Sequence, residues 1–299
     1  MDFMKNKIIK IVLYIVGIFC IAYPIYSRFL AYKNQTESIY DYKKEIITMQ
    51  QEELEEKRKK AEEFNQNNSN ETSVIDTDSI VEKTDEETST YNFLDLGEMM
   101  GYISIPKISI ELPIYEGVTV NNLTKGVAHM ENTSLPNGNL STHAVLAGHT
   151  GISQAEIFDN ISKLTEGDEF FVTFYGVTTK YKVIRESVVL PDETRDLKIE
   201  PDRCLVTLVT CTPKSVNTHR LLVTGEKVEE IIEQVQEEPA QEEVQVIQKK
   251  SNIELLRDFV SRNSTLFIII LLIIILLVIL TILNKIASKR RKENEKKHQ

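Results

Sequence analysis

Cysteine is scarce in this chain: only three of its 299 residues are cysteines. That number excludes a disulfide framework of the kind that stabilises small secreted domains. Cys20 lies in an apolar segment near the N-terminus, where a cysteine packs as a small hydrophobic residue. Cys204 and Cys211 fall on one predicted strand, so their Cα atoms would lie roughly 23 Å apart, far beyond the ~7 Å limit for a disulfide. Cys211 is therefore predicted to be a free thiol.

Two further absences exclude classes of partner. No histidine and cysteine stand close together with the spacing of zinc ligands, so we predict no metal site and no cofactor. The formal net charge is −10 and is unevenly distributed, because the outer linkers are acidic while the two ends are basic. With this charge distribution, nucleic acid is not an expected partner.

Long hydrophobic runs are missing from the middle of the chain but occur near both ends. Segment 265–283 is apolar throughout, and about 20 such residues span a bilayer as a helix. Segment 11–27 is shorter, contains Pro24 and has no small-residue cleavage site after it. We therefore predict two transmembrane helices, the first of them an uncleaved signal anchor.

The flanking charges predict the orientation of these helices. Lys5, Lys7 and Lys10 precede the first helix, and the tail 285–299 is strongly basic. Basic flanks stay on the cytoplasmic side, so both termini are expected in the cytoplasm and the middle of the chain outside the cell membrane.

Composition divides the rest of the chain into segments. Segment 38–64 is rich in Glu, Lys and Gln and lacks Gly and Pro, which predicts a solvated helical stalk. The polar, acidic stretch that follows it is predicted to be flexible. The predicted organisation is 1–30, N-terminal stub and signal anchor; 31–90, extracellular helical stalk and acidic linker; 91–228, catalytic β domain; 229–263, acidic tether; 264–284, transmembrane helix; and 285–299, basic tail.

The middle domain has the pattern of a β-barrel. Short β-branched and aromatic runs recur, separated by Pro, Gly, Asn and Asp. The predicted strands are 101–106, 110–115, 144–147, 169–175, 179–189, 204–210 and 220–227, with a short helix near 154–161. We predict a mainly β fold: a closed antiparallel barrel of about eight strands with short helices, flanked by the two transmembrane helices.

Three residue types that together support acyl transfer occur at predicted strand ends. Segment 207–211 (Thr-Leu-Val-Thr-Cys) ends in Cys211, and Arg220 follows nine positions later on the next strand. Segment 144–151 ends another strand at His149. A thiolate attacks carbonyl carbon, an imidazole transfers protons, and arginine keeps its charge and stabilises an oxyanion. The pattern predicts an enzyme with these three residues as nucleophile, general acid and base, and oxyanion stabiliser.

The remaining candidates have plainer interpretations. His143 lies six residues before His149 on the same strand, deeper in the domain, and is expected to be a hydrogen-bonded core histidine. His219 precedes Arg220 and points the other way, so its expected role is structural, and His129 is a strand or loop residue. Thr210 is a candidate for fixing the substrate or the thiolate.

These segments resemble the sortases, in particular the class C, pilin-polymerising sortases of Gram-positive bacteria. The family's Thr-Leu-x-Thr-Cys motif is met at 207–211, and the resemblance extends over roughly 95–228. A C-terminal membrane helix also suits class C. The other segments that match are 126–129 and 143–149 in the histidine region, 190–192 and 196–201 in the penultimate loop, and 212–223 around the arginine.

The resemblance implies a substrate and a reaction. The substrate would be a surface protein with a Leu-Pro-x-Thr-Gly-like (LPXTG-like) sorting signal, cleaved after threonine and held as a thioester on Cys211. The acceptor in class C is a lysine amine of another pilin. The nearest alternative is a sortase of another class that attaches proteins to cell-wall peptide. A papain-like hydrolase fits less well because its cysteine precedes its histidine, and a non-enzymatic membrane-anchored surface domain is the distant alternative.

One departure from class C concerns the lid. Many class C sortases carry an Asp-Pro-aromatic triplet ahead of the barrel that plugs the active site. Segment 89–100 has no such triplet, although Phe93 or Asp95 could serve a lid of another kind. Autoinhibition by the usual plug is therefore not expected.

Overall fold

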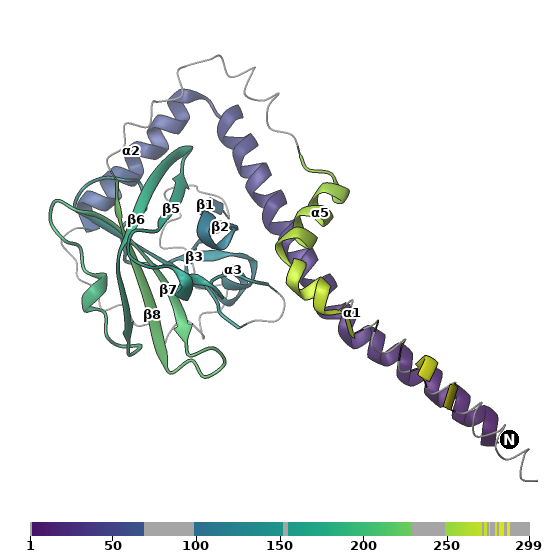
Figure 1. The fold of residues 1–299 in the computed structure, drawn as a ribbon. Helices are drawn as coiled ribbons and strands as arrows, with labels where there is room; N and C mark the ends of the chain where they lie inside the picture. Colours follow the sequence, from purple (N-terminus) through teal and green to yellow (C-terminus); the bar gives the residue numbers. More distant parts are fainter. Residues whose placement is uncertain are drawn as a thin grey trace, which may run out of the picture. The chain divides into compact units, whose positions relative to one another are not determined.

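A computed structural model describes most of the chain (Figure 1). The residues described are 2–68, 99–151, 155–228 and 249–270, with 272, 273, 275, 279, 281–283, 286 and 287. The chain divides into two units, Met1–Lys249 and Lys250–Gln299. The elements of the first unit are α1 (Asp2–Thr48), α2 (Gln51–Asn68), β1 (Met99–Ile105), η3 (Pro106–Ile108), β2 (Ile110–Glu116), α3 (Val120–Lys125), β3 (Val127–His129), β4 (Thr142–Ala147), η4 (Ile161–Lys163), β5 (Glu169–Phe174), β6 (Val177–Val189), η5 (Arg195–Leu197), β7 (Cys204–Thr212) and β8 (His219–Lys227). The second unit contains α5 (Asn252–Arg262), which begins with a capping box between Ser251 and Glu254.

Eight strands form a closed barrel in the order β1-β2-β3-β4-β7-β8-β6-β5. The predicted closed barrel is confirmed, and the seven predicted strands all occur. The three-residue strand β3 was too short to stand out in the sequence. The prediction of a fully antiparallel barrel was wrong, because β2 pairs with β3 and β4 pairs with β7 in parallel. Each parallel pair needs a crossover connection: α3 joins β2 to β3, and β5 and β6 lie between β4 and β7.

Both faces of β7 are buried, and each face belongs to a different apolar cluster. Cys204, Val206 and Leu208 point into the barrel and join its main core. Val209 points outward, because successive side chains of a strand face opposite sides. We call the outward-facing set the outer cluster; it consists of Val118, Leu123, Ala128, Met130, Val145, Ala147, Leu197, Val209 and Leu222. Leu123 of α3 and Leu197 of η5 belong to it, so these short helices cover that face of the sheet.

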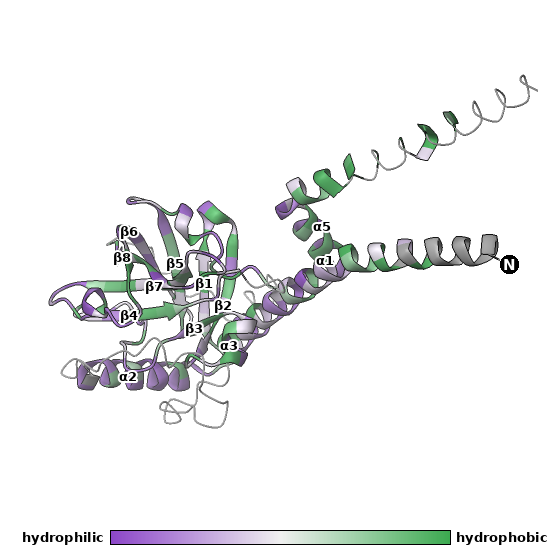
Figure 2. Ribbon diagram, turned by 90° about the horizontal axis from the view of Figure 1, so that it is seen from below, coloured by the Kyte–Doolittle hydropathy of each residue, from purple (hydrophilic) through white to green (hydrophobic). Residues whose placement is uncertain are grey.

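The helix predicted over 38–64 is present as the end of α1 and most of α2, but it is not a solvated stalk. Leu54 and Ala61 of α2 are buried in the main core cluster. Arg58 donates to the carbonyl oxygen of Tyr175 through Nε and Nη2 at 3.2 and 2.8 Å. Figure 2 shows α2 beside the barrel as a mostly hydrophilic helix. The few apolar residues of α2 suffice to pack the helix on the barrel because they share one face.

Polar contacts also hold the two N-terminal helices against the barrel. The amide of Asn65 donates to the carbonyl of Leu135 at 2.9 Å and accepts from its N–H at 2.7 Å. The side chain of Gln35 in α1 donates to the carbonyl of Lys125 at the end of α3. A buried side-chain amide that satisfies backbone groups in this way fixes both the position and the rotation of its helix.

Shortening Leu54 to alanine is expected to lower the free energy of unfolding by about 2–4 kcal/mol, because a buried Leu→Ala change loses packing and leaves a cavity. Chemical denaturation of the two proteins measures the difference. Glu52→Ala is the matched control, since Glu52 lies on the exposed side of the same helix. Equal midpoints for the two variants would contradict the packing of α2 on the barrel.

Other predictions fall wholly or partly outside the described residues. In the part of the chain that the structure describes, no helix is both long and apolar enough to cross a membrane. Segment 11–27 lies within α1, and 265–283 includes residues that are not described, so both membrane helices stay predictions. The linker 69–90, most of the tether 229–263 and the lid candidates Phe93 and Asp95 also lie outside the described residues.

The short helix expected near 154–161 is not formed by residues 155–160, and a 3-10 turn occurs later, at η4. Contacts with the loop after β4 take the place of helical ones. The N–H of Phe158 donates to the carbonyl of His149 at 2.9 Å rather than to a carbonyl four residues before it.

Candidate active site

Cys211 and Arg220 are direct neighbours in the antiparallel ladder of β7 and β8, where each is the register partner of the other. Directly opposite residues have Cβ atoms about 4.5–5.5 Å apart and point to the same face. Val209 and Leu222 form the corresponding outward pair two residues earlier, so the thiol and the guanidinium continue the outer cluster toward the edge of the sheet. Cys211 is a free, half-buried thiol, as predicted.

His149 approaches Cys211 from β4, which flanks β7 on the side opposite to β8. The parallel register places Ala147 of β4 beside Val209 of β7. The N–H of Gly148 then donates to the carbonyl of Val209 at 3.0 Å, which continues the pairing past the end of β4. If this register is extended by two residues, His149 comes level with Cys211, and neighbouring strands lie about 4.8 Å apart. The structure thus brings all three predicted catalytic residues to one edge of three adjacent strands.

Backbone and side-chain contacts fix the loop that carries the histidine, residues 148–151, which we call the histidine loop. The hydroxyl of Thr210 is buried and donates to the carbonyl of Gly148 at 2.7 Å. A Cβ on Gly148 would lie 2.5 Å from the ring of Phe158, so only glycine fits there. Thr210 thus supports the loop from the face opposite to Cys211, and its predicted contact with substrate stays a prediction.

Partial burial of His149 lowers the pKa of its imidazole below the ordinary value of 6.5, because a charged ring is less well solvated there. The neutral ring therefore predominates at pH 7. A neutral imidazole next to a thiol can accept its proton, and the imidazolium so formed can pass that proton on.

We expect the imidazole of His149 to titrate with a midpoint below 6.5 in the Cys211→Ala variant. Proton NMR of the ring resonances across pH 4–8 measures this, and loss of the signal in His149→Gln assigns it. The sign follows from burial, which disfavours the charged ring. A midpoint at or above 6.5 would contradict the half-buried position of the ring.

Arg220 is buried, and its guanidinium donates through Nη1 to the carbonyls of Asn217 and His219 at 3.2 and 3.3 Å. These contacts hold the group against the turn between β7 and β8. A guanidinium keeps its charge at any physiological pH and presents its N–H donors in a fixed plane, which suits a carbonyl oxygen that becomes negative. The position matches the predicted role of oxyanion stabiliser.

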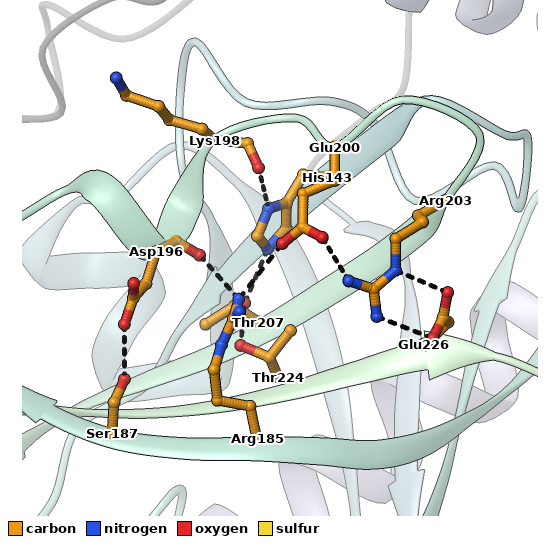
Figure 3. Close-up of polar contacts among 10 residues, drawn as sticks. All are labelled: His143, Arg185, Ser187, Asp196, Lys198, Glu200, Arg203, Thr207, Thr224 and Glu226. Atoms are coloured by element: carbon orange, nitrogen blue, oxygen red, sulfur yellow. Dashed lines mark hydrogen bonds and ion pairs between the residues drawn. The ribbon is translucent and has the colours of Figure 1, made fainter.

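His143 is a buried, hydrogen-bonded core histidine, as expected. Figure 3 shows its ring between the carbonyl of Lys198 and the hydroxyl of Thr207, at 2.8 and 2.7 Å. Thr207 in turn contacts the hydroxyl of Thr224 on β8 at 2.8 Å. Sequence reasoning missed this network, because the partner carbonyl at 198 lies in a loop whose position the strand pattern does not predict.

The two other histidines among the described residues, His129 and His219, have contacts of their own. His129 in β3 is fully buried, which lowers its pKa to about 4 and keeps it neutral. The ring of His219 contacts the hydroxyl of Thr218 at 2.9 Å. Among the described residues, no group of three or more His, Cys, Asp or Glu side chains could hold a metal ion.

Comparison with known proteins agrees with this geometry. The family model described as "Sortase domain" matches residues 103–228. The structure of sortase C-1 from Actinomyces oris is similar, with 45% sequence identity, 60% of this chain and 99% of that chain covered, and a TM-score of 0.56. The chain belongs to the sortase family. Sortases are cysteine transpeptidases, so the free thiol at the barrel edge belongs to an enzyme.

Two further sortases show how far the similarity extends. Sortase C from Clostridium perfringens, solved with the C-terminal cell wall sorting motif, shares 38% identity over 65% of this chain and 99% of that chain, with a TM-score of 0.57. Sortase A of Bacillus anthracis is 29% identical over 228 residues, which cover 74% of this chain and 94% of that protein. The predicted sortase-type barrel is thereby confirmed.

Proposed function

We propose that this sortase cleaves an LPXTG-like sorting signal after its threonine and transfers the acyl group to a lysine amine of a pilin. One observation carries the proposal: Cys211 and Arg220 face each other across two strands, and His149 follows two residues after the end of the third, β4, whose last pair is Ala147 with Val209. A nucleophile, an oxyanion donor and a proton carrier at one edge are the groups that acyl transfer needs.

The first half-reaction forms a thioester. The sulfur of Cys211 bonds to the carbonyl carbon of the substrate threonine while His149 takes the thiol proton. The carbonyl oxygen becomes an oxyanion, which the guanidinium of Arg220 stabilises by charge and hydrogen bonds. Collapse of this intermediate breaks the Thr–Gly bond, and the imidazolium gives its proton to the departing glycine amine.

The second half-reaction transfers the acyl group. A neutral lysine amine attacks the thioester carbonyl, and His149 accepts the proton that the nitrogen loses. Arg220 again stabilises the oxyanion. The carbon–sulfur bond then breaks, the proton returns to Cys211, and the product holds an isopeptide bond.

The choice of a pilin as acceptor rests on the similarity to sortases of class C. The proposed location is the cell membrane, with both termini in the cytoplasm and the barrel outside. Support for it comes from the apolar segments 11–27 and 265–283 and from the basic tail. Anchoring in the same membrane as the secreted substrate would raise their effective concentration.

The test uses the full chain in detergent with a Leu-Pro-x-Thr-Gly peptide and mass spectrometry. We expect an acyl adduct on Cys211 whose mass equals the peptide cut after threonine. A pilin with its lysines and a wall-peptide mimic are then added separately. Release by the pilin lysine alone supports the proposal, and release only by the wall peptide indicates an anchoring sortase. Absence of an adduct with a range of sorting peptides would contradict transpeptidation of such signals.

A further inference from the structure

Asp159 lies between the two segments that carry the catalytic pair. Its Oδ1 accepts a hydrogen bond from the N–H of Gly151 in the histidine loop at 3.1 Å. The same oxygen lies 3.2 Å from Nζ of Lys214, in the turn 213–218 that follows Cys211. One carboxylate oxygen therefore joins the segment after His149 to the segment after the thiol.

The residues before Asp159 hold the same loop. The N–H of Phe158 bonds to the carbonyl of His149 at 2.9 Å, and its ring packs on Gly148 without room for a Cβ. The histidine loop is therefore held along its length by 157–159. It also meets the turn directly, since a Cβ built on Gly151 would lie 3.8 Å from the backbone N of Ser215.

The link matters because both catalytic residues stand at the ends of their ladders. Pairing of β4 with β7 ends at Ala147, and His149 lies beyond it. The pairing of β7 with β8 ends at Thr212, one residue after the thiol. Beyond these points no strand pairing holds the two segments together, so their separation depends on contacts such as those of Asp159.

The carboxylate of Asp159 is more shielded from water than its ion-pair partner. The side chain of Asp159 is 14% exposed, although Lys214 is 52% exposed. Its Oδ2 is buried and has no hydrogen-bond partner among the described residues. The N–H of Gly151 and the ammonium of Lys214 both donate to its Oδ1.

We propose that Asp159 is a positioning residue for acyl transfer, which holds His149 and Cys211 at a fixed separation through Gly151 and Lys214. The inference rests on the catalytic roles proposed above. A carboxylate suits this role because an amide oxygen could still accept from Gly151 but, without the charge, would attract the ammonium of Lys214 less strongly. Misplacement of a catalytic group by about 1 Å can slow a reaction on the order of 100-fold.

The experiment compares Asp159→Ala, Asp159→Asn and Lys214→Gln in the full chain. Asp168→Ala is the matched control: its Oδ2 accepts from the N–H of Thr165 at 2.6 Å and contacts Nζ of Lys107 at 2.5 Å, and its side chain is 21% exposed. Asp168 thus makes the same kinds of contact on the loop before β5. This loop is far from the site. Glu169, next to Asp168, pairs with Lys182 of β6, and Lys182 lies roughly 20 Å along that strand from Val189, the register partner of Arg220.

Two measurements separate positioning from stability. The first is the rate of adduct formation at saturating and subsaturating peptide. The second is the pH profile of Cys211 alkylation by iodoacetamide, which needs no peptide. We expect Asp159→Ala to slow adduct formation at saturating peptide by about 10–100-fold with little change in KM. Its alkylation profile should move toward that of His149→Ala, and Asp159→Asn and Lys214→Gln should show smaller changes in the same direction.

The Asp168→Ala control distinguishes a positioning role of Asp159 from a general loss of stability. Asp168→Ala should leave the rate and the alkylation profile within about twofold of wild type, even where it lowers the melting temperature as much as Asp159→Ala does. Equal effects of the two alanine variants, or wild-type behaviour of Asp159→Ala, would overturn the inference. If the wild-type enzyme forms no adduct, the proposed function fails, and the alkylation profile still decides the role of Asp159.

Discussion

Replacing Cys211 by alanine is expected to abolish both the acyl adduct and the release of the glycine-containing fragment. The thiol is the proposed nucleophile, and alanine offers no atom that can form the covalent intermediate. Removal of a nucleophile of this kind lowers kcat by on the order of 10⁶-fold, to a level that only long incubations would detect. Mass spectrometry of the intact protein measures the adduct, and chromatography of the peptide measures cleavage.

Cys204 provides the control for this experiment. It lies on the same strand but faces the barrel interior, where its sulfur lies 3.6 Å from the hydroxyl of Thr142. Cys204→Ala should therefore lower stability and keep the adduct. Full turnover by Cys211→Ala would remove this thiol from the mechanism altogether.

Replacing Arg220 by alanine is expected to lower kcat/KM by about 100–1,000-fold, the usual effect of losing an oxyanion donor. The loss should fall mainly on kcat, since the oxyanion exists only in the transition state and the intermediate. Arg220→Lys keeps the positive charge but loses the planar set of donors, so it should recover only part of the rate. Steady-state kinetics with a fluorogenic sorting peptide gives both constants.

Arg203→Ala is the control for Arg220. Arg203 is partly exposed and forms ion pairs with Glu226 and Glu200 away from the thiol. Its replacement should change kcat/KM less than about threefold, because it contacts no reacting atom. An equal loss in the two variants would indicate that arginine acts through stability rather than through the oxyanion.

The strands and the candidate catalytic residues could be picked out because both leave local signals in the sequence. Turn residues separate β-branched runs, and alternation along β7 predicts that Cys204 and Cys211 face opposite sides, as they do. The partners of each strand could not be predicted in this way. A strand pattern is the same whether its neighbour is parallel or antiparallel, so the pairing of β4 with β7 appears only in the structure.

The contacts around the site could not be predicted from local sequence patterns either. Asp159 lies in a segment predicted to be helical, and its role depends on Gly151 and Lys214, which are 8 and 55 residues away. Leu54 is visibly apolar in the sequence, but a helix with so few apolar residues is predicted to be solvated. The surface of the barrel against which it packs cannot be recognised from the sequence of the helix. Long-range packing decided both cases.

The parallel neighbours β4 and β7 have a consequence for how sortases of this kind can diversify. Everything between them, residues 148–203, leaves the catalytic edge and returns to the far end of the barrel before β7 begins. A change of length in a surface turn of that excursion, such as 190–194 after β6, would leave the pairing of β4 with β7 unaltered. Such turns can therefore vary in length while the ladder that leads to Cys211 stays the same.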